Sequence, residues 1–559
     1  MERNAIAATV LVIMILLGYQ WYLARFEAPA QEAPRTAAAP SEPQKSAPTP
    51  SMQPATPSGT AASRPKAYTP TASLGVAARD VTVDTPLMHI VLSTAGGRVT
   101  SWQLKAYLMD SGAPVDLVPH QGGADVPGPL AAWADTEQIQ GVFEVDKDRL
   151  DLTRSGATGT LTFKHVSAAG LLLQKRLTFS ADRYNAEVDI TVQNLSDGDV
   201  AVQPSLAWGP GLRNSKDKKA TTIQPPTLWV DGKQVQEDLE KVNGVKATSG
   251  KISWTALQDT YFVAALLPEK EGLSAFVDKT KENQPIVGLS ETKKVLQPGG
   301  ELGLKAKAFA GPRDLDILRA EGQDLDKIID LGWFDFVARP ALWLLKFLYN
   351  FTGNYVIAII LVTVLQKVVF YPLTHKSMKS MQAMQAMQPK VQALQERYKN
   401  NPQKKQEETM ALYKKHGVNP MGGCLPMVVQ IPIFIALYNA LSNSVELWQA
   451  HFLWIRDLTQ PDSLFKLTVW GGYELSGNLL GLLMGVSMWL QQKMSPTAGD
   501  PRQAQMMLWM MPILFTFMFW SFPAGLVLYW FVNNLLQIGQ QWLINRAPAR
   551  PPAAEGQAA

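Results

Sequence analysis

The pattern of hydrophobic and polar positions divides the chain into three kinds of segment. Residues 5–23 form an apolar run long enough to cross a bilayer, with Trp21 and Tyr22 at its far end. Residues 81–312 alternate apolar and polar positions, as half-buried strands do. After residue 331, apolar runs of near-spanning length recur. This pattern predicts a polytopic α-helical membrane protein with a large all-β domain outside the membrane.

The N-terminal segment 1–26 is interpreted as an uncleaved transmembrane anchor. Ala28-Pro29-Ala30 loosely resembles a signal-peptide cleavage site, so a cleavable signal is the alternative, and in either interpretation the next segment is exported. The stretch 27–79 is rich in Pro, Ala, Ser and Thr and has hardly any large apolar residues. Such a composition buries too little surface to offset the ordering entropy, and it predicts a disordered linker.

Residues 80–330 are predicted to form an all-β sandwich. Turn signals such as Gly96-Gly97 separate alternating runs whose apolar members include Val81, Val83, Met88, Ile90, Leu92, Val188, Ile190 and Val192. His89, His120 and His165 are isolated, and the domain has no nucleophile–base spacing or phosphate loop. A scaffolding or docking role is therefore favoured, with a carbohydrate-active role as the alternative.

The last part of the chain is predicted to form an interfacial helix and a core of five spans. Residues 331–352 mix aromatic side chains with Arg339, Lys346 and a central Pro340, which suits a helix lying in the membrane interface. The core 353–545 contains five predicted spans, which make six with the anchor: Tyr355–Leu373, Leu425–Leu441, Leu475–Gln492, Met506–Phe522 and Ala524–Ile544. The span from Leu475 is the weakest, and a short or re-entrant segment is its alternative.

Loop charge predicts the orientation of these spans. The loop 374–424 carries nine Lys or Arg residues, whereas the loop 442–474 carries two. Because cytoplasmic loops are enriched in Lys and Arg, the first loop is predicted to be cytoplasmic and the second external. Counting spans then places the N-terminus and the tail 546–559 in the cytoplasm and the β domain in the periplasm.

Composition excludes several classes of function. The net charge is +4 over 559 residues, and no segment has the dense basic character of a nucleic-acid binder. Cys424 is the only cysteine, which excludes a disulfide framework and a cysteine-based zinc site. The sequence shows no nucleotide motif either. We therefore expect no metal, no cofactor, no nucleic-acid partner and no enzymatic activity.

Lys367 is the most informative single residue. It lies eight residues before His375, roughly 12 Å along the helix from the cytoplasmic end of its span. None of the five C-terminal spans contains Asp or Glu, so this chain offers no intramembrane acid to pair with it. Snorkelling of the long Lys stem to the headgroups is the alternative interpretation.

Further polar residues at span depth change the picture around Lys367. They are Thr363, Gln366, Gln430, Asn439, Ser487, Asn533, Asn534 and Gln537. Each of them alone is explained by a helix-to-helix hydrogen bond. Together with an unpaired cation, they indicate a hydrated cavity into which a passing chain would bring the missing acid. An ion-coupled secondary transporter is the alternative, and the absence of intramembrane carboxylates argues against it.

The cytoplasmic loop is predicted to contain a helical hairpin, 374–420. Asn400-Asn401-Pro402 is expected to break the helix, and Glu407–Lys415 to form the second arm. Four methionines recur every three residues: Met378, Met381, Met384 and Met387. They are interpreted either as filling of the hairpin core or as an adaptable surface for varied apolar segments.

Several motifs together resemble those of the YidC branch of the YidC/Oxa/Alb insertases. In the membrane part these are Phe370–Thr374, Asn419–Pro426, Gln430–Phe434, Gln492–Pro496 and Phe522–Tyr529. Upstream, Trp254–Leu267 and Ala310–Pro312 resemble the periplasmic domain of Gram-negative members. Their order and spacing match over about 200 residues of the membrane part, which argues against coincidence.

The resemblance implies a five-helix insertase core around a hydrophilic groove that is open to the cytoplasm and lipid and closed to the outside. It places Lys367 where the family usually has Arg, and Trp530 where Tyr is common. Thr363, Gln430, Tyr529 and Asn534 are the other expected groove residues. Implied partners are nascent integral membrane proteins, which the protein would insert and chaperone, the Sec translocon, the ribosome or signal recognition machinery, and the inner-membrane bilayer.

Overall fold

The computed structural model describes residues 77–109, 111–119, 126–135, 139–213, 224–417, 425–469, 473–494 and 501–546. The predicted anchor, the linker up to residue 76 and the tail beyond Arg546 lie outside the described residues, as do His120 and Cys424. The described chain falls into two units: one is Pro389–Gly417, and the other holds everything else.

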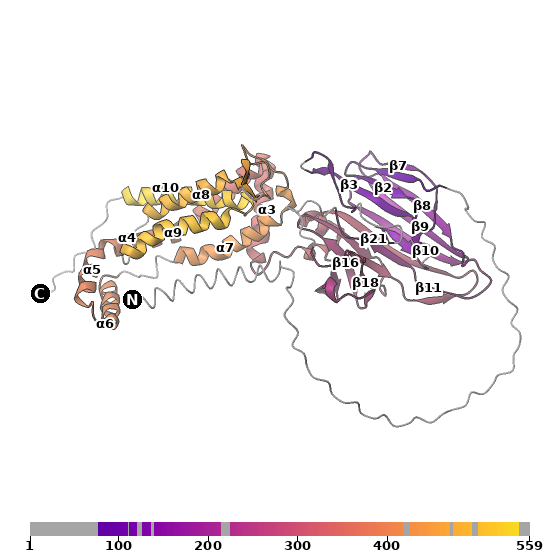
Figure 1. The fold of residues 1–559 in the computed structure, drawn as a ribbon, viewed down its shortest axis with the longest axis horizontal. Helices are drawn as coiled ribbons and strands as arrows, with labels where there is room; N and C mark the ends of the chain where they lie inside the picture. Colours follow the sequence, from indigo (N-terminus) through magenta and orange to yellow (C-terminus); the bar gives the residue numbers. More distant parts are fainter. Residues whose placement is uncertain are drawn as a thin grey trace, which may run out of the picture. The chain divides into compact units, whose positions relative to one another are not determined.

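The β domain consists of antiparallel sheets, apart from one parallel pairing of β1 with β7 (Figure 1). One five-stranded sheet has the order β4(Pro114–Asp116), β3(Arg98–Leu108), β2(Met88–Ser93), β1(Asp80–Asp84), β7(Arg149–Asp151). The nine-stranded sheet has the order β14(Lys233–Gln236), β13(Thr227–Val230), β16(Ile252–Gln258), β17(Phe262–Pro268), β21(Glu301–Pro312), β10(Asn185–Asn194), β9(Leu171–Ser180), β8(Thr158–Val166), β6(Glu144–Val145). The third has the order β15(Lys246–Thr248), β18(Ser274–Lys279), β19(Pro285–Ser290), β12(Ser205–Trp208), β5(Ala131–Trp133), and a small ladder joins β11(Val200–Val202) to β20(Lys294–Leu296).

The predicted alternation of the strands is confirmed. The apolar positions singled out in β1, β2 and β10 are at most 1% exposed, so they all face the interior of the domain. Trp102 on β3 is fully buried and packs against Trp208 of β12 and Phe179 of β9, at ring-centroid distances of 5.7 and 6.5 Å. These contacts join the three sheets in one core, and the prediction of a β sandwich holds.

A charged cluster joins the end of the β domain to the helices. Lys346 on α3(Asp335–Thr352) lies 3.0 Å from Asp314, 2.7 Å from Asp316 and 2.9 Å from Glu446. Asp314 caps α2(Leu315–Glu321), directly after β21, and Glu446 belongs to the 3₁₀ turn that follows α7. Burial lowers the pKa of Lys346, but Glu446 and the hydrogen bond that the ammonium donates to Asp316 outweigh it and raise the pKa above its usual value, so the ammonium stays charged.

A second contact between the two regions is made by Trp448. Its Nε1 donates to the Leu108 carbonyl at 2.9 Å, and its ring lies edge-on to Tyr261 and Phe262 at 4.9 and 5.4 Å. The Arg213 guanidinium stacks over the same indole at 5.4 Å. The motif around Tyr261, which resembles the family's periplasmic domain, thus forms the surface on which Trp448 rests.

The helix α3 has one buried and one exposed face. Ala338, Leu342 and Leu345 are at most 8% exposed, while its aromatic side chains are largely exposed: Phe336 at 72%, Trp343 at 66% and Phe351 at 75%. Pro340 is the sixth residue of the helix, in its second turn, where it cannot donate a backbone hydrogen bond to the Phe336 carbonyl. This division is the amphipathic pattern expected from the sequence.

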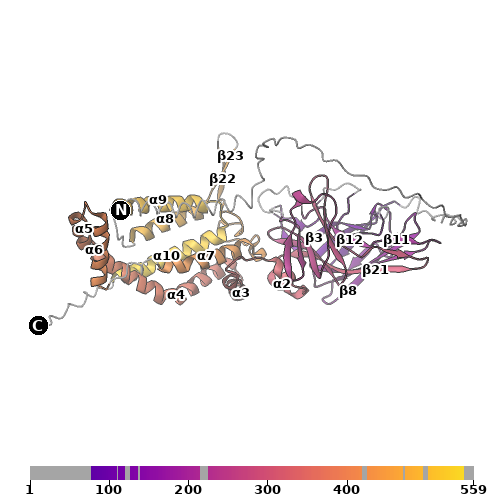
Figure 2. The same ribbon diagram turned by 90° about the horizontal axis from the view of Figure 1, so that it is seen from below.

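Five further helices form the bundle after α3 (Figure 2). They are α4(Tyr355–Ala386), α7(Leu425–Ser442), α8(Leu479–Met494), α9(Pro501–Phe519) and α10(Ala524–Arg546). By length and apolar composition, α4 alone among the described helices qualifies as a candidate membrane span, and α7 and α9 contain shorter apolar helices. The predicted span from Leu475 is corrected at its start, because Leu475 lies in strand β23(Tyr473–Gly477), which pairs with β22(Phe465–Val469).

The ends of these helices meet in an ordered way. Asn478, just before α8, donates to the Trp520 carbonyl just after α9, so these two helices are antiparallel. At the start of α10, Gly525 donates to the Leu458 carbonyl, and the Leu480 amide of α8 donates to Asp462 of the same loop. The starts of α8 and α10 and the end of α9 therefore lie at one end of the bundle, the end that carries Trp448 and Glu446.

The unit Pro389–Gly417 belongs to a helical hairpin. Its arms are α5(Gln388–Arg397) and α6(Pro402–Lys415), and Asn401 caps α6 by accepting from the Lys404 amide at 3.1 Å. The expected break at Pro402 and the second arm are confirmed. The first arm differs from expectation, because α4 continues as one 32-residue helix to Ala386 and carries most of the methionine stretch.

The charged cluster predicts how strongly the junction depends on Lys346. In Lys346→Ala, three carboxylates lose their shared cation, and we expect a loss of about 1.5–3 kcal/mol in unfolding free energy, measured by chemical unfolding in mixed micelles. Arg319→Ala is the matched control, because its pair with Asp316 is exposed and is worth less than about 1 kcal/mol. Equal losses of unfolding free energy in the two variants would contradict the stabilising role of the Lys346 cluster.

Candidate functional site

Hydrogen bonds between side chains of α4 and α10 form a row along the bundle, here called the polar seam. Its four pairs, taken along both helices, are Gln366 with Tyr529, Lys367 with Gln537, Thr374 with Gln540, and Gln382 with Asn545. Residue numbers rise together on the two helices, so α4 and α10 run parallel. In an apolar bundle these contacts fix the register of the two helices, because each polar group needs a partner.

Helical periodicity explains why the polar residues of α4 face α10. Gln366, Lys367 and Thr374 are separated by one and seven residues, which keeps them on one side of a 3.6-residue helix. Val368 and Val369 lie on the other side and are 64% and 62% exposed. The helix therefore has a polar face turned into the bundle and an apolar face turned out of it.

One end of the polar seam is a closed ring of three side chains. The Tyr529 hydroxyl donates to Gln366 at 3.0 Å, the Gln430 amide of α7 donates to the Tyr529 oxygen at 2.6 Å, and the Gln366 amide donates to Gln430 at 3.4 Å. Tyr529 is 1% exposed, while both glutamines are half-buried. The ring ties three helices together through partners that are all neutral.

Lys367 occupies the next position of the seam. Its ammonium donates to Gln537 Oε1, and no carboxylate in the described chain lies within ion-pair distance of it. The side chain is half-buried and turns across to α10. An uncompensated positive charge therefore lies among neutral hydrogen-bonding groups.

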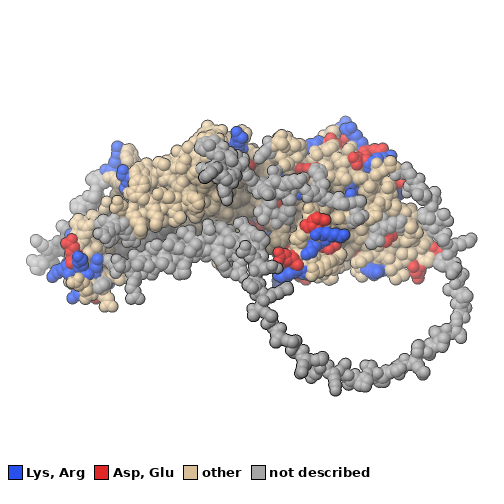
Figure 3. All heavy atoms as spheres, viewed as in Figure 1, with Lys and Arg blue, Asp and Glu red and all other residues tan. Residues whose placement is uncertain are grey.

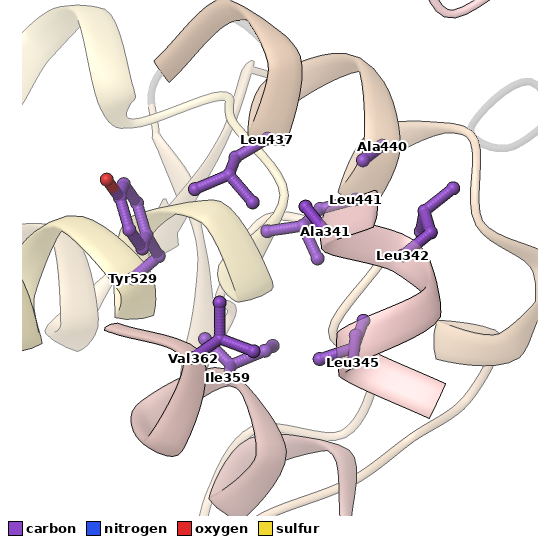
Figure 4. A pocket seen from close by; sticks show the side chains of 9 residues that line it. All are labelled: Ala341, Leu342, Leu345, Ile359, Val362, Leu437, Ala440, Leu441 and Tyr529. Atoms are coloured by element: carbon purple, nitrogen blue, oxygen red, sulfur yellow. The ribbon is translucent and has the colours of Figure 1, made fainter. Parts of the chain in front are cut away.

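Beyond the ring, toward the start of α4, apolar side chains line a small cavity (Figure 4). Its volume is about 10 Å³, at the lower limit for a single water molecule, and its lining is here called the apolar closure. The lining residues are Ala341, Leu342, Leu345, Ile359, Val362, Leu437, Ala440, Leu441 and Tyr529. Tyr529 belongs to both features, because its ring lines the cavity and its hydroxyl belongs to the polar ring.

The other residues expected at the site lie beside the polar seam. Asn534 is buried and donates to Ser487 of α8 at 3.1 Å. Thr363 is fully buried and donates to the Ile359 carbonyl of its own helix at 2.7 Å. Trp530 is half-buried in an aromatic cluster, 5.0 Å from the Phe434 ring.

The four methionines do not form an exposed stripe. Met378, Met384 and Met387 are at most 8% exposed, and Met381 is half-buried. Gln366 and Gln537 are among the polar residues predicted at span depth, but they were not among the predicted site residues. The hydrogen bonds of Gln366 to Tyr529 and of Gln537 to Lys367 make both glutamines part of the site. The sequence signal for this was their spacing on each helix, since Gln366 precedes Lys367 and Gln537 follows Tyr529 by eight residues.

A fully buried lysine of the β domain has a structural role. Lys175 on β9 is fully buried and donates to the carbonyls of Gly97 and Leu130, and burial lowers its pKa to about 7. Among the described residues, no group of His, Cys, Asp or Glu is suited to hold a metal ion. His89 lies 3.5 Å from Asp84, and both side chains are about one third exposed.

Charge is distributed unevenly over the surface. In Figure 3, Lys, Arg, Asp and Glu are visible on the β domain and on the hairpin helices α5 and α6, while the visible face of the bundle helices is mostly uncharged. Exposed large hydrophobic side chains are frequent on α4, α7, α9 and α10. An apolar helical bundle with a polar interior seam and a charged β domain defines a membrane protein with a large extramembrane domain.

Two family models match almost the whole described chain. Residues 80–344 match the YidC periplasmic domain, and residues 347–550 match the 60Kd inner membrane protein. A protein named membrane protein insertase YidC from Syntrophus aciditrophicus is 36% identical over 98% of this chain and 100% of its own length. The same name is given to relatives from Geotalea daltonii, 37% identical over 98% of this chain and 99% of their own, and from Geobacter sulfurreducens, 39% identical over 83% and 86%.

The chain belongs to the YidC family of inner-membrane proteins. Residues of the polar seam and of the surface beneath Trp448 both fall within the matched ranges.

The three-membered ring predicts a measurable coupling between α7 and α10. In Tyr529→Phe, Gln430 and Gln366 each lose a partner, and we expect a loss of about 1–2 kcal/mol in unfolding free energy in mixed micelles. A double-mutant cycle with Gln430→Leu should then give a coupling of at least about 0.5 kcal/mol. Tyr371→Phe is the control, because Tyr371 is 50% exposed and removal of its hydroxyl should change stability little. Strict additivity of the Tyr529 and Gln430 substitutions would refute the ring.

Proposed function

We propose that this protein is an inner-membrane insertase and chaperone, which admits polar segments of client membrane proteins along the polar seam. The single observation that carries the proposal is the uncompensated Lys367 ammonium between α4 and α10. The names of the relatives support the class of function, and the contacts of the described residues support the mechanism.

The proposed topology has six spans, five of which form the core. Its support is the direction of the helices: α4 and α10 are parallel, α8 starts beside α10, and α9 opposes α8. The α7 residues beside α4 run in the opposite order, since Gln430 accepts from Gln366 while Leu437 lines the same cavity as Ile359 and Val362. Alternation of this kind requires α4, α8 and α10 to cross in one direction.

The same topology puts the β domain in the periplasm and both termini in the cytoplasm. The end of the bundle that carries Trp448 and Glu446 contacts the β domain, and the nine-cation loop follows the opposite end of α4. Cytoplasmic loops concentrate Lys and Arg, which favours this orientation over the reverse. The apolar closure around Tyr529 then lies on the periplasmic side of the seam.

In this mechanism the seam lowers the cost of bringing a client's polar tail to span depth. A charged side chain at the centre of a bilayer costs about 3 kcal/mol on insertion scales. Lys367 offers an opposite charge to an acidic tail, and the glutamines and hydroxyls of the polar seam offer hydrogen bonds to a neutral one. The apolar segment of the client then leaves for lipid across the exposed face of α4, and its burial in hydrocarbon supplies the driving force.

In this mechanism the apolar closure limits how far the client's polar tail enters the bundle before its apolar segment moves into lipid. Its cavity of about 10 Å³ has no room for a peptide, so a tail that enters from the cytoplasm meets Tyr529 at the end of the polar seam. We propose that Trp530, packed on Phe434, forms the apolar contact along which the client's hydrophobic segment moves. Thr363 and Asn534 support the helices around this path through their own hydrogen bonds.

The hairpin is proposed to receive the machinery that delivers clients. The unit Pro389–Gly417 carries seven Lys or Arg residues and has an exposed surface, which suits ribosomes or signal recognition factors. The methionines at the end of α4 are mostly buried. Their burial favours a role in packing and argues against a role as an exposed surface that binds clients. Cooperation with the Sec translocon is proposed through the periplasmic β domain, for which a scaffolding or docking role is favoured.

The mechanism predicts that insertion depends on the charge of residue 367. Purified protein in proteoliposomes is given a short single-span client with an acidic exported tail, and insertion is scored by protease protection. Lys367→Arg should insert at a rate within about twofold of wild type, while Lys367→Ala should fall about tenfold.

The matched client with its acidic residues replaced by amides separates the possible results. It should be inserted equally by wild type and Lys367→Ala, because the lost interaction is between charges. If Lys367→Ala inserts both clients as well as wild type does, Lys367 only snorkels. If folded wild-type protein inserts neither client, the insertase proposal itself fails.

The topology predicts which side of the membrane two engineered cysteines face. In a Cys424→Ser background, Leu453→Cys in the loop after α7 should react with an impermeant maleimide in spheroplasts, since Leu453 is 76% exposed. Lys379→Cys at the exposed far part of α4 should react only after the membrane is permeabilised. Labelling of Lys379→Cys in intact spheroplasts would invert the proposed orientation.

A further inference from the structure

We propose that Gln537 determines the charge selectivity of the seam, by holding the Lys367 ammonium in place without neutralising it. The inference rests on the proposed function, and it names a residue that fixes which client tails the site prefers. It starts from a single contact, the hydrogen bond that Lys367 donates to the Gln537 side-chain oxygen.

The first step concerns where the ammonium would go without this contact. A Lys side chain is a flexible four-carbon stem that reaches toward headgroups when nothing holds it. Gln537 lies on α10, so the hydrogen bond turns the stem sideways across the interface between α4 and α10. The contact thus places the charge in the polar seam, between the ring at Tyr529 and the pair Thr374–Gln540.

The second step concerns how much of the ammonium remains available. A Lys ammonium has three N–H donors, and within the described chain Gln537 accepts one of them. Two donors and the full positive charge remain for an incoming carboxylate. An amide oxygen is suited to this task because it orients the cation through its dipole and leaves the net charge at +1.

The third step concerns the alternative residue at position 537. A glutamate has nearly the same shape as glutamine, and in a site of low dielectric it would form an ion pair with Lys367. The helices α4, α7, α8, α9 and α10 contain no Asp or Glu, so no other group on them can take that part. The neutrality of residue 537 is therefore the condition for an open binding position for acidic tails.

The neighbouring contacts indicate that only at position 537 would an acidic residue neutralise a cation of the polar seam. Thr374 with Gln540, and Gln382 with Asn545, are neutral on both sides, so exchange of an amide for a carboxylate there touches no cation in the polar seam. Arg546 is exposed at the end of α10 and belongs to no pair of the polar seam, which makes Arg546→Gln a matched control. It changes the net charge of the same helix by the same amount as Gln537→Glu, about two and a half turns beyond Gln537 and away from Lys367.

The test compares two clients in proteoliposomes of the full chain: a single-span protein with an acidic tail, and the same protein with amides in place of the acids. The measured quantity is the ratio of their insertion rates, scored by protease protection. In Gln537→Glu we expect the rate for the acidic tail to fall about tenfold, toward that of Lys367→Ala, while the rate for the neutral tail stays within about twofold. Arg546→Gln should keep the wild-type ratio.

A second substitution keeps the inference open to refutation if Gln537→Glu does not fold. Gln537→Met removes the acceptor and adds no charge, so the Lys367 stem is released toward the headgroups and the preference for the acidic tail should fall, while the rate for the neutral tail stays within about twofold. If folded Gln537→Met keeps the wild-type ratio, Gln537 does not hold the ammonium in place and the inference is overturned. A wild-type ratio in folded Gln537→Glu would overturn it as well.

The double variant Lys367→Ala with Gln537→Glu reverses the sign of the site. It should favour a client with a basic tail over the acidic one, because the position then carries a single negative charge. Failure of this inference alone leaves wild type active and Lys367→Ala defective. Failure of the proposed function is a different result, in which wild type inserts neither client.

Discussion

A polar side chain inside an apolar helix bundle must find its partner on a neighbouring helix, and the arrangement of the core follows from this requirement. Four pairs along α4 and α10 hold the two helices parallel and in one register. The ring through Gln430 adds α7. Once these contacts are satisfied, Lys367 cannot point elsewhere without breaking its bond to Gln537. The location of the one charge in the seam is thus a consequence of how neutral groups pair around it.

The boundary between polar and apolar packing gives the seam its direction. Tyr529 contributes its hydroxyl to the ring and its aromatic face to the apolar closure, so a single side chain marks where hydrogen-bonding groups end. The closure lies at the end of the bundle that meets the β domain through Trp448 and the Lys346 cluster. A bundle closed at that end and polar along its interior suits entry from the opposite end, which is what the proposed insertion mechanism requires.

Much of this organisation was predictable from the sequence, because hydrophobic periodicity depends on local geometry alone. Alternating apolar residues predicted the strands of the β domain, and Val81, Ile90 and Val188 are all buried. The mixture of aromatic and charged residues predicted the two-faced helix α3. Helix limits were predicted less well: α4 runs on to Ala386, and Leu475 belongs to a strand, because helix ends depend on capping and tertiary contacts that periodicity does not record.

By itself the sequence determined which residues are polar at span depth and that none of them is acidic, since composition and spacing are enough to establish both. Only the tertiary structure decided which of them meet. It paired Lys367 with Gln537, 170 residues later in the chain, and closed Gln366, Gln430 and Tyr529 into a ring. It also left Thr363 bonded to its own helix. The physical reason is that spacing along one helix fixes a face, whereas partners across helices depend on register and rotation, which arise only when the bundle packs.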